Sequence, residues 1–388
     1  MENNFNQLDI NTVINFLKSS KNNNLILTQS KYVKKFEKNW SKWLGVKYSV
    51  FVNSGSSANF LSMSILKILK KGGEVIVPTL TWVSDVNSVI YNGFKPIFVD
   101  INPKNLCMDE DKIIKKINNK TVAIFMTHAQ GFNGLTTNLL KILKKRKIEL
   151  IEDVCESHGA TFNKKKLGTF GLMSNFSFYY AHHMSTIEGG MISTNNKKIY
   201  QIARSLRSHG MLREIDSKIE EKKIIKKYPK LSPKFIFIHK GFNFRNNEIG
   251  GLLGLSQLKR LDRNIKKRNE NFRYFLKNLD KNYFVGDYNM DGISNYAFPL
   301  ILKKKSFVLR KKLEETMKKY KIEYRRGNAG GGNQLRQPYI SQETKHIKLS
   351  NFKNVEHIHF FGYYIGNYPG LKKNKILKLT KILNSFNT

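Results

Sequence analysis

Residues 174–190, SNFSFYYAHHMSTIEGG, contain the pattern that decides the fold. A short apolar and aromatic run with Phe176, Phe178 and Tyr179 predicts a strand, and a His-His-Met-Ser-Thr turn follows it before a pair of glycines. A strand that ends in polar residues presents them at the carboxyl edge of a sheet, where open α/β proteins bind their ligands. We therefore predict that His182, within this turn, is the catalytic residue. The alternative is a structural histidine packed beside a strand end.

Strands and helices alternate along the chain upstream of this stretch. Apolar runs predict strands at 48–52, 74–78, 95–100, 121–131 and 148–153, with helical stretches between them. Strands that are almost wholly apolar are typical of a parallel sheet covered on both faces. After residue 248 a long helical stretch, kinked near Asp262, leads to another strand, helix and glycine-rich loop. We expect a large α/β domain over 1–250, which begins with a helical segment, and a smaller C-terminal α/β domain over 251–388.

The charge of the chain is strongly positive. Its 388 residues include 68 Lys and Arg against 29 Asp and Glu, for a formal net charge of +39. Such a balance is typical of nucleic-acid binding. The lysines, however, are spread over the polar faces of predicted helices, as in LLKILKKRK, which indicates a compositional bias rather than a binding groove. We expect no nucleic-acid partner, although the positive field would attract an anionic substrate.

Cysteine content and hydropathy exclude several classes of protein. Cys107 and Cys155 are the only cysteines, too few for a disulfide framework or for the four ligands of an iron–sulfur cluster. We expect neither a metal nor such a cluster. The N-terminal stretch MENNFNQLDINTVINFLKSS lacks the basic and apolar regions of a signal peptide, and no run reaches the roughly 18 apolar residues of a membrane span. The expected location is the cytoplasm, with no membrane partner.

Three upstream motifs supply groups that a pyridoxal phosphate (PLP) site needs. Ser54 to Ser57 form a Gly-Ser turn that opens a helix, Trp82 follows a strand, and Asp153 and Glu156 lie at the end of another strand. Free N–H groups at a helix start suit a phosphate, an aromatic ring can stack on the cofactor, and a carboxylate keeps its ring nitrogen protonated. Taken singly, each motif has a structural alternative: a helix cap, a core tryptophan, an ion-paired aspartate.

The order of five motifs resembles a known family. NSGSSAN, VPTLTWVS, IEDVCESHGA, SFYYAHHMSTIEGG and GFNFRNNEIGGLLG are similar to the motifs of the DegT/DnrJ/EryC1/StrS sugar aminotransferase family of fold-type I PLP enzymes. The resemblance covers most of the chain. It implies an aspartate aminotransferase-like fold with a mostly parallel seven-stranded sheet in the large domain. It also implies a homodimer whose two active sites are shared between the subunits.

The resemblance also implies roles for particular residues. Trp82 would stack on the cofactor ring, Asp153 would contact its nitrogen and Glu156 its hydroxyl. The phosphate would be held by Gly55, Ser56, Ser177 and, from the neighbouring subunit, Asn243. The residues implied to contact the substrate are His209, Arg213, Asn333 and Arg336.

The chain departs from the majority pattern of the family at His182. Most members carry there the lysine that holds the cofactor covalently, and histidine resembles the dehydratase branch. That branch implies dehydration at C3 of a nucleotide-linked 4-keto-6-deoxy hexose or heptose, with GDP as the favoured nucleotide. The cofactor would cycle between PLP and pyridoxamine phosphate with L-glutamate as amino donor, and ammonia would be released, in the synthesis of a surface polysaccharide. The alternatives are a nucleotide-sugar aminotransferase and a non-catalytic module that binds a nucleotide sugar or PLP.

Overall fold

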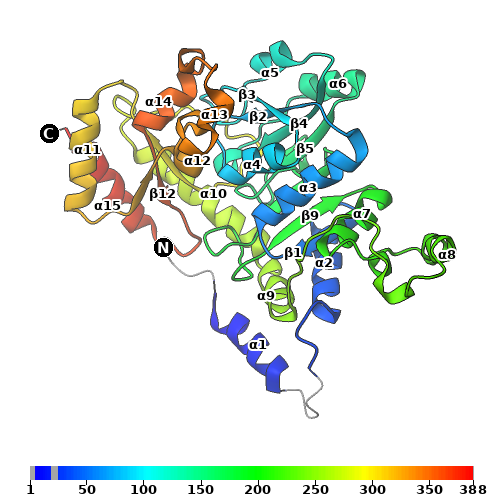
Figure 1. The fold of residues 1–388 in the computed structure, drawn as a ribbon. Coiled ribbons are helices and arrows are strands. Elements are labelled where there is room, and N and C mark those ends of the chain that lie inside the picture. The colour runs from blue at the N-terminus through cyan, green and yellow to red at the C-terminus, as the bar shows by residue number, and fades with distance from the viewer. Residues whose placement is uncertain (1–4, 19–24, 388) are drawn as a thin grey trace.

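A seven-stranded sheet forms the centre of the structure, a computed structural model that describes residues 5–18 and 25–387 (Figure 1). The strands lie in the order β1-β9-β8-β5-β4-β2-β3. Their bounds are β1 Tyr48–Val52, β2 Glu74–Pro78, β3 Lys95–Val99, β4 Thr121–Thr127, β5 Glu149–Asp153, β8 Met173–Ser177 and β9 Gly190–Thr194. Within this sheet β9 runs antiparallel to both of its neighbours, β1 and β8, and the other strand pairs are parallel. The expected mostly parallel seven-stranded sheet is confirmed.

Helices cover the sheet because the connections between parallel strands must cross a face. α2 and α7 contact β1, and α3 contacts β8 and β9. The helices of this part are α1 Gln7–Lys18, α2 Lys31–Leu44, α3 Gly55–Lys70, α4 Val83–Tyr91, α5 Glu110–Lys116, α6 Thr137–Arg146, α7 Lys197–Arg207, α8 Lys218–Lys227 and α9 Glu248–Leu258. A short hairpin, β6 Thr161–Phe162 with β7 Lys165–Lys166, follows β5. Every residue of β2, β8 and β9 is buried, including the polar residues of β8 and β9.

The strand that precedes the His-His turn is shorter than the sequence suggests. β8 ends at Ser177, so Phe178 and Tyr179 belong to the turn. The Phe178 N–H donates to the Gly189 carbonyl, and the Thr186 N–H donates to the Phe178 carbonyl. The antiparallel pairing of β8 with β9 stops at Ser177 and Gly190. Beyond that pair, these two bonds hold the ends of the turn together.

A second, three-stranded antiparallel sheet forms the C-terminal part, in the order β10-β12-β11. Its strands are β10 Ala297–Ile301, β11 Tyr324–Arg326 and β12 Gly362–Gly366. The helices here are α10 Leu261–Asn278, α11 Phe307–Lys319, α12 Asn328–Gly331, α13 Ser341–Thr344, α14 Lys353–Phe361 and α15 Lys373–Asn384. α9 ends at Leu258 and α10 begins at Leu261, close to the expected kink.

One hydrophobic core extends across both sheets. Phe132, after β4, packs on Phe272 of α10 with ring centroids 6.2 Å apart, and Phe275 stacks on Phe298 of β10 at 4.5 Å. The large buried aromatic area of this core explains how α10 joins the two parts. The domain boundary between residues 250 and 251 stays a prediction, because this core continues beyond it.

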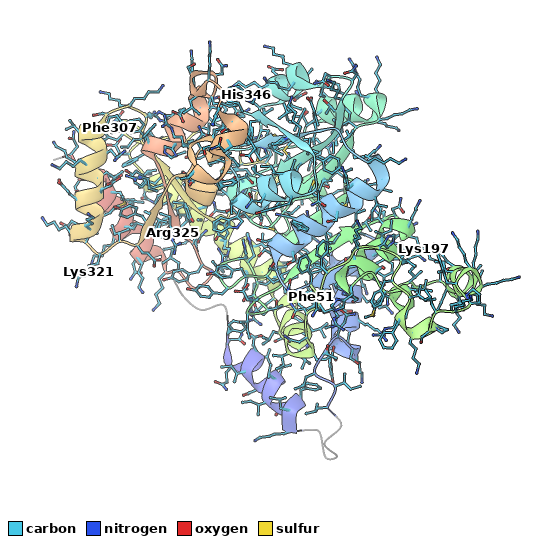
Figure 2. The ribbon with its side chains drawn as sticks, viewed as in Figure 1. Phe51, Lys197, Phe307, Lys321, Arg325 and His346 are labelled. Atoms are coloured by element: carbon cyan, nitrogen blue, oxygen red, sulfur yellow. The ribbon has the colours of Figure 1, made fainter. Side chains whose placement is uncertain are left out.

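Basic side chains project from most of the outline of the molecule (Figure 2). Lys197 and Lys321 point outward from opposite ends, and α8 carries a dense group of cations on a segment that stands away from the sheet. No residue of α8 is buried. Within residues 5–18 and 25–387, no helix has the length and hydropathy that a membrane crossing requires.

Candidate active site

A cavity of about 490 Å³ opens at the carboxyl edge of the large sheet. Parallel pairing brings the ends of neighbouring strands together here, with Thr127 of β4 opposite Asp153 of β5, and Asp153 opposite Asn175 of β8. Seven of the residues expected to act in catalysis or cofactor binding line the cavity: Gly55, Ser56, Trp82, Asp153, Glu156, Ser177 and His182. The arrangement is the one expected for a ligand site of an open α/β sheet.

The start of α3 forms an anion cradle on one side of the cavity. Ser54 caps the helix by accepting a hydrogen bond from the Ser57 N–H at 3.0 Å. The N–H groups of Gly55 and Ser56 have no partner within the helix, because they belong to its first turn. A Cβ atom on Gly55 would lie 2.6 Å from Ser177 Cβ, so glycine is required where α3 meets the end of β8. These groups fit a phosphate, which the helix dipole also favours.

Asp153 supplies a carboxylate in the interior of the cavity. Its Oδ1 accepts from the Cys155 N–H at 2.8 Å and its Oδ2 from Asn59 Nδ2 at 2.9 Å. The side chain is buried at the end of β5, and Asn59 comes from the second turn of α3. The two donors fix the carboxylate direction. An anion held in this way fits the protonated nitrogen of a pyridine ring.

Glu156 adds a second carboxyl group to the cavity. The Gln130 N–H donates to its Oε2 at 2.7 Å. Gln130 has a left-handed backbone conformation, with a φ of +57°. Burial, opposed by that hydrogen bond and reinforced by the charge of Asp153, raises the pKa of Glu156 to about 7. The group is therefore close to half protonated at neutral pH, and its neutral form can donate a hydrogen bond as well as accept one.

His182 lies in the wall of the same cavity, half-buried, with its N–H bonded to the Tyr179 carbonyl at 3.0 Å. Its ring packs near His158, at 6.1 Å between centroids, and near Tyr296 at 5.4 Å. Burial, and next the charge of Arg268, lowers the pKa of His182 to about 3. His182 is thus a neutral imidazole at physiological pH, which is the form that accepts a proton.

Two further histidines stand behind His182. His183 Nε2 lies 3.1 Å from the Ser294 carbonyl and 3.0 Å from its hydroxyl, and His158 packs 5.4 Å from His183. Burial lowers the pKa of both well below the ordinary value. Their neutral rings form a packed support for the turn.

Trp82 forms part of the rim. It lies at the N-cap position of α4 and is 59% exposed, unlike a core tryptophan. An exposed indole beside a cavity can stack on a flat ligand.

The C-terminal part closes the cavity from the opposite side. Residues 327–340 dock onto the loop between β2 and α4, where the Gln334 N–H donates to the Thr79 carbonyl at 2.8 Å and Gln334 Nε2 donates to the Thr81 carbonyl at 2.9 Å. The glycine-rich loop is therefore an ordered wall of the site and not a flexible linker. Ala329 and Gly330 of this loop line the cavity.

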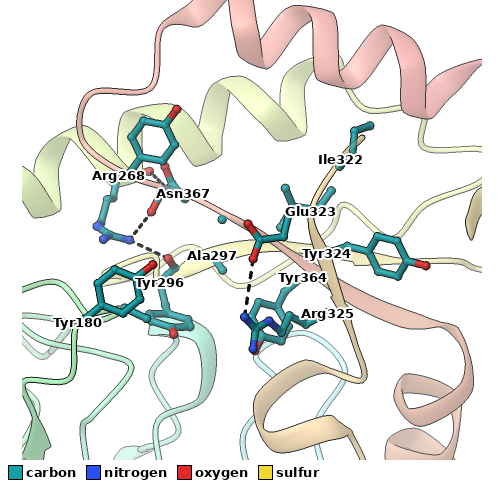
Figure 3. Close-up of a pocket in the computed structure, with 14 residues that line it drawn as sticks. Tyr180, Arg268, Tyr296, Ala297, Ile322, Glu323, Tyr324, Arg325, Tyr364 and Asn367 are labelled. Carbon is teal, nitrogen blue, oxygen red and sulfur yellow. Dashed lines mark hydrogen bonds and ion pairs between the residues drawn. The ribbon is translucent and has the colours of Figure 1, made fainter. Parts of the chain in front are cut away.

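A second cavity, of about 200 Å³, adjoins the first (Figure 3). Figure 3 shows Arg268 of α10 beside Tyr296, and Glu323 beside Arg325 on the strand side. Arg268 Nη1 donates to the Tyr296 carbonyl at 2.8 Å and to the Asn367 carbonyl, and Arg325 Nη2 lies 3.7 Å from Glu323 Oε1. Residues that line both cavities are Tyr180, Ala181, Tyr296, Glu323, Arg325 and Tyr364.

Sequence reasoning did not identify these shared residues. Tyr296, Arg325 and Tyr364 lie more than 100 positions after His182, on strands or strand ends of the C-terminal sheet. The signal was weak: a tandem Arg325-Arg326 after a predicted helix. Only the docking of the C-terminal sheet places them at the cavity.

Five residues predicted to bind cofactor or substrate do not line this cavity. Asn243 is exposed and accepts from Arg245 Nε at 2.9 Å, and His209 and Arg213 are exposed in the preceding turn. Asn333 Nδ2 and the Arg336 guanidinium both donate to Glu356, Asn333 at 2.7 Å. The roles assigned to these five residues stay predictions. Within the described residues, no cluster of three or more His, Cys, Asp or Glu side chains is arranged to hold a metal ion.

Comparison with known proteins gives a consistent picture. The model of the DegT/DnrJ/EryC1/StrS aminotransferase family matches residues 7–383. The GDP-4-keto-6-deoxy-D-mannose 3-dehydratase of Escherichia coli O55:H7 is 35% identical over 349 residues, which are 88% of this chain and 89% of that protein. The GDP-perosamine synthase of Escherichia coli O157:H7 is 28% identical over 368 residues, 93% of this chain and 92% of that protein.

The fold is shared with solved structures as well. A crystal structure of GDP-4-keto-6-deoxymannose-3-dehydratase with a trapped PLP-glutamate geminal diamine is similar with a TM-score of 0.85 at 32% identity, over 98% of each chain. The match extends over almost the whole length of both chains. The chain therefore belongs to the DegT/DnrJ/EryC1/StrS aminotransferase family, with the fold of type I PLP enzymes.

Proposed function

We propose that this protein is a PLP- and glutamate-dependent 3-dehydratase of a GDP-linked 4-keto-6-deoxy sugar. The observation that carries the proposal is His182 in the cavity wall, at the position where most of the family carries a lysine, together with a lining in which no lysine occurs among the described residues. A site without lysine does not hold PLP through a Schiff base to the protein. The names of the dehydratase relatives support the same reaction and nucleotide.

The residues present fit the cofactor. Gly55, Ser56 and Ser177 would hold the phosphate, Asp153 would face the ring nitrogen and Trp82 would stack on the ring. Neutral Glu156 would hydrogen-bond to the ring hydroxyl, as a glutamine would. When bound, the cofactor accepts an amino group from glutamate and serves as an electron sink beside the sugar.

His182 would move the protons of the reaction. As a neutral imidazole it accepts a proton from the carbon next to the cofactor ring. The imidazolium then formed has a depressed pKa and is correspondingly the stronger acid toward the departing C3 hydroxyl. One side chain thus serves both steps. Elimination needs this imidazole close to both atoms, which the packed histidines behind it favour.

The lining of the two cavities supports a binding place for the anionic part of the substrate. Arg325 is a cation at the junction of the two cavities and suits an anionic group of a bound substrate. His209, Arg213 and Asn243 are exposed and do not line the cavity of their own chain, which supports a homodimer in which they reach a neighbour's site. The product would be a 3,6-dideoxy-4-keto sugar for a surface polysaccharide, with ammonia released.

The test is an assay of the purified protein with PLP, L-glutamate and GDP-4-keto-6-deoxymannose. We expect release of ammonia, measured by an ammonia assay, and a product lighter than the substrate by one oxygen atom, measured by mass spectrometry. The variant H182N should lose the reaction by at least a hundredfold, the usual contribution of a general acid and base. H346N, which changes an exposed histidine, is the matched control and should behave as the unmodified protein.

The aminotransferase is the second candidate, because GDP-perosamine synthase is also a relative. It predicts a stable amino sugar and no ammonia from the same assay. It also predicts a borohydride-trapped adduct between PLP and a lysine of the unmodified protein. Either result would replace the dehydratase proposal. The variant H182K provides the positive control for trapping.

A further inference from the structure

Asp85 is a buried carboxyl group in the first turn of α4, just behind the cavity. It is fully shielded from solvent. Its Oδ2 is in hydrogen-bond contact with Thr127 Oγ1, at 2.5 Å, and with Thr81 Oγ1, and its Oδ1 accepts from Asn59 Nδ2 at 2.6 Å. No basic side chain forms an ion pair with it in the described part of the chain. A buried anion without a cation is costly, so the neutral acid is the favoured form.

The contacts of the Thr81 and Thr127 hydroxyls also indicate that Asp85 is protonated. Thr81 Oγ1 and Thr127 Oγ1 lie 2.8 Å apart, and both contact Asp85 Oδ2, so three oxygens meet in a triangle. Three hydrogen bonds need three protons, and the two hydroxyls supply only two. A protonated Asp85 carboxyl supplies the third: it donates to one threonine, that hydroxyl donates to the other threonine, and the second hydroxyl donates back to Asp85 Oδ2. Burial and the charge of Asp153 also raise the pKa of Asp85 well above its ordinary value.

Asn59 links this acid to the cavity. Its Nδ2 donates to Asp85 Oδ1 at 2.6 Å and to Asp153 Oδ2 at 2.9 Å, so one amide bridges the two carboxyl groups. The same nitrogen also lies 3.1 Å from Ser84 Oγ, a longer contact than either of those to the carboxyl groups. The position of Asp153 Oδ2 therefore depends on Asn59, and the orientation of Asn59 depends on Asp85.

We propose that Asp85 is a positioning residue that stays protonated and, through Asn59, aims the Asp153 carboxylate at the ring nitrogen of the bound cofactor. Because Asp85 is neutral, the two aspartates together carry a single negative charge, which matches one protonated ring nitrogen. Asp85 does not contact the cofactor. The inference rests on the cofactor part of the proposed function and is independent of the dehydration step.

The test uses two substitutions at one position. Asp85→Asn reproduces a protonated acid, because its oxygen can accept from Asn59 and its amide can donate to the threonines. Asp85→Ala removes the support of Asn59. The control is Asp109→Asn, which changes a carboxyl that caps α5 away from the site. Each purified protein is titrated with PLP labelled with ¹⁵N in the ring, and the ¹⁵N chemical shift reports ring protonation.

We expect D85N to bind PLP within about threefold of the unmodified protein and with a protonated ring. D85A should bind about tenfold more weakly, as for the loss of one charge-assisted hydrogen bond, with the shift moved toward the unprotonated ring. In the cofactor-free protein, the infrared difference between wild type and D85N should contain the carbonyl stretch of a protonated acid. If D85A does not fold, Asn59→Ser replaces it, since it cuts the same bridge.

Three results would overturn the proposal. D85N could change the ring shift as much as D85A, which would mean that a negative charge at residue 85 is required. D85A could leave affinity and shift unchanged. The cofactor-free difference spectrum could contain no acid carbonyl band. A protein that gives the expected shifts but releases no ammonia would contradict the proposed reaction and support this inference.

Discussion

Burial shifts the pKa values of Glu156 and His182 in the directions that the proposed chemistry requires. Glu156 becomes neutral near pH 7 and His182 stays neutral far below it, because each charged form would lie in a poorly solvated wall. The two groups therefore offer a donor and an acceptor at the same pH. Glu156 also gives a measurable signature, because a shifted pKa changes the stability of the protein with pH.

Replacing Glu156 by glutamine should remove a pH-dependent loss of stability. The pKa of Glu156 is about 7 in the native state against an ordinary 4.5, so the native state binds this proton more tightly than the unfolded chain. The stabilisation is complete below pH 4.5 and is lost as the pH rises to 7. Relative to wild type, E156Q should gain about 2 to 3 kcal/mol of unfolding free energy between pH 4.5 and pH 8.

Urea unfolding of the cofactor-free proteins at both pH values measures this difference. E270Q is the control, because Glu270 is a partly exposed residue of α10 that forms an ion pair with Lys267 across one helix turn. Its curve should follow that of the unmodified protein. Parallel pH dependences of wild type and E156Q would show that Glu156 does not titrate near neutrality.

Strand alternation explains how β5 serves two purposes. Successive side chains of a strand point to opposite faces. Asp153 faces the cavity, whereas Glu152 accepts hydrogen bonds from the loop that leads into β8. Glu152 takes the N–H groups of Gly168, Phe170 and Gly171 at 2.7, 2.9 and 2.7 Å. This anchor fixes the start of β8, and β8 in turn leads to His182.

The substitution E152Q should therefore destabilise the fold. An amide in place of the carboxylate presents N–H to at least one backbone N–H in a fully buried position. We expect a loss of about 2 to 4 kcal/mol of unfolding free energy, as for a buried charged group that loses its hydrogen bonds. Chemical denaturation measures it. The surface variant E270Q should change the free energy of unfolding by less than about 0.5 kcal/mol. If E152Q and E270Q lost the same amount, Glu152 would not be the anchor of the loop before β8.

At the scale of the whole molecule, the charge of +39 surrounds a site proposed to take a nucleotide diphosphate. The field of spread lysines raises the encounter rate of an anion and is screened by salt. We expect KM for the nucleotide sugar to rise about fivefold between 50 mM and 500 mM NaCl with kcat unchanged. Steady-state kinetics at several salt concentrations measure this. A KM independent of salt would show that the surface charge has no part in substrate capture.

If the active site is shared between two subunits, two inactive variants should complement each other in a mixed dimer. H182N damages the subunit's own site, whereas N243A, at an exposed residue, would damage the site of its neighbour. Each homodimer should be inactive. Co-expressed in equal amounts, the two variants should recover about a quarter of the wild-type activity, because half of the dimers are mixed and each of these has one intact site. No recovery would place Asn243 outside the site.

The sequence by itself determined the local elements and the residues at their ends. The predicted strand 48–52 and the predicted strand 74–78 match β1 and β2, because apolar runs of this length are buried wherever they pack. Asp153 is the last residue of β5 and His182 lies in the turn after β8, so the positions of the strand ends bring them to one edge of the sheet. The family motifs lie on the same elements.

Only the tertiary structure decided which distant groups complete the site. Arg325 and Tyr364 enter the wall because the C-terminal sheet docks there, whereas Asn333 donates to Glu356 and does not line the cavity. The bridge from Asp85 through Asn59 to Asp153 joins three elements that are remote in sequence. Periodicity records which face of an element is buried but not against what, and the protonation of Asp85 depends on that packing.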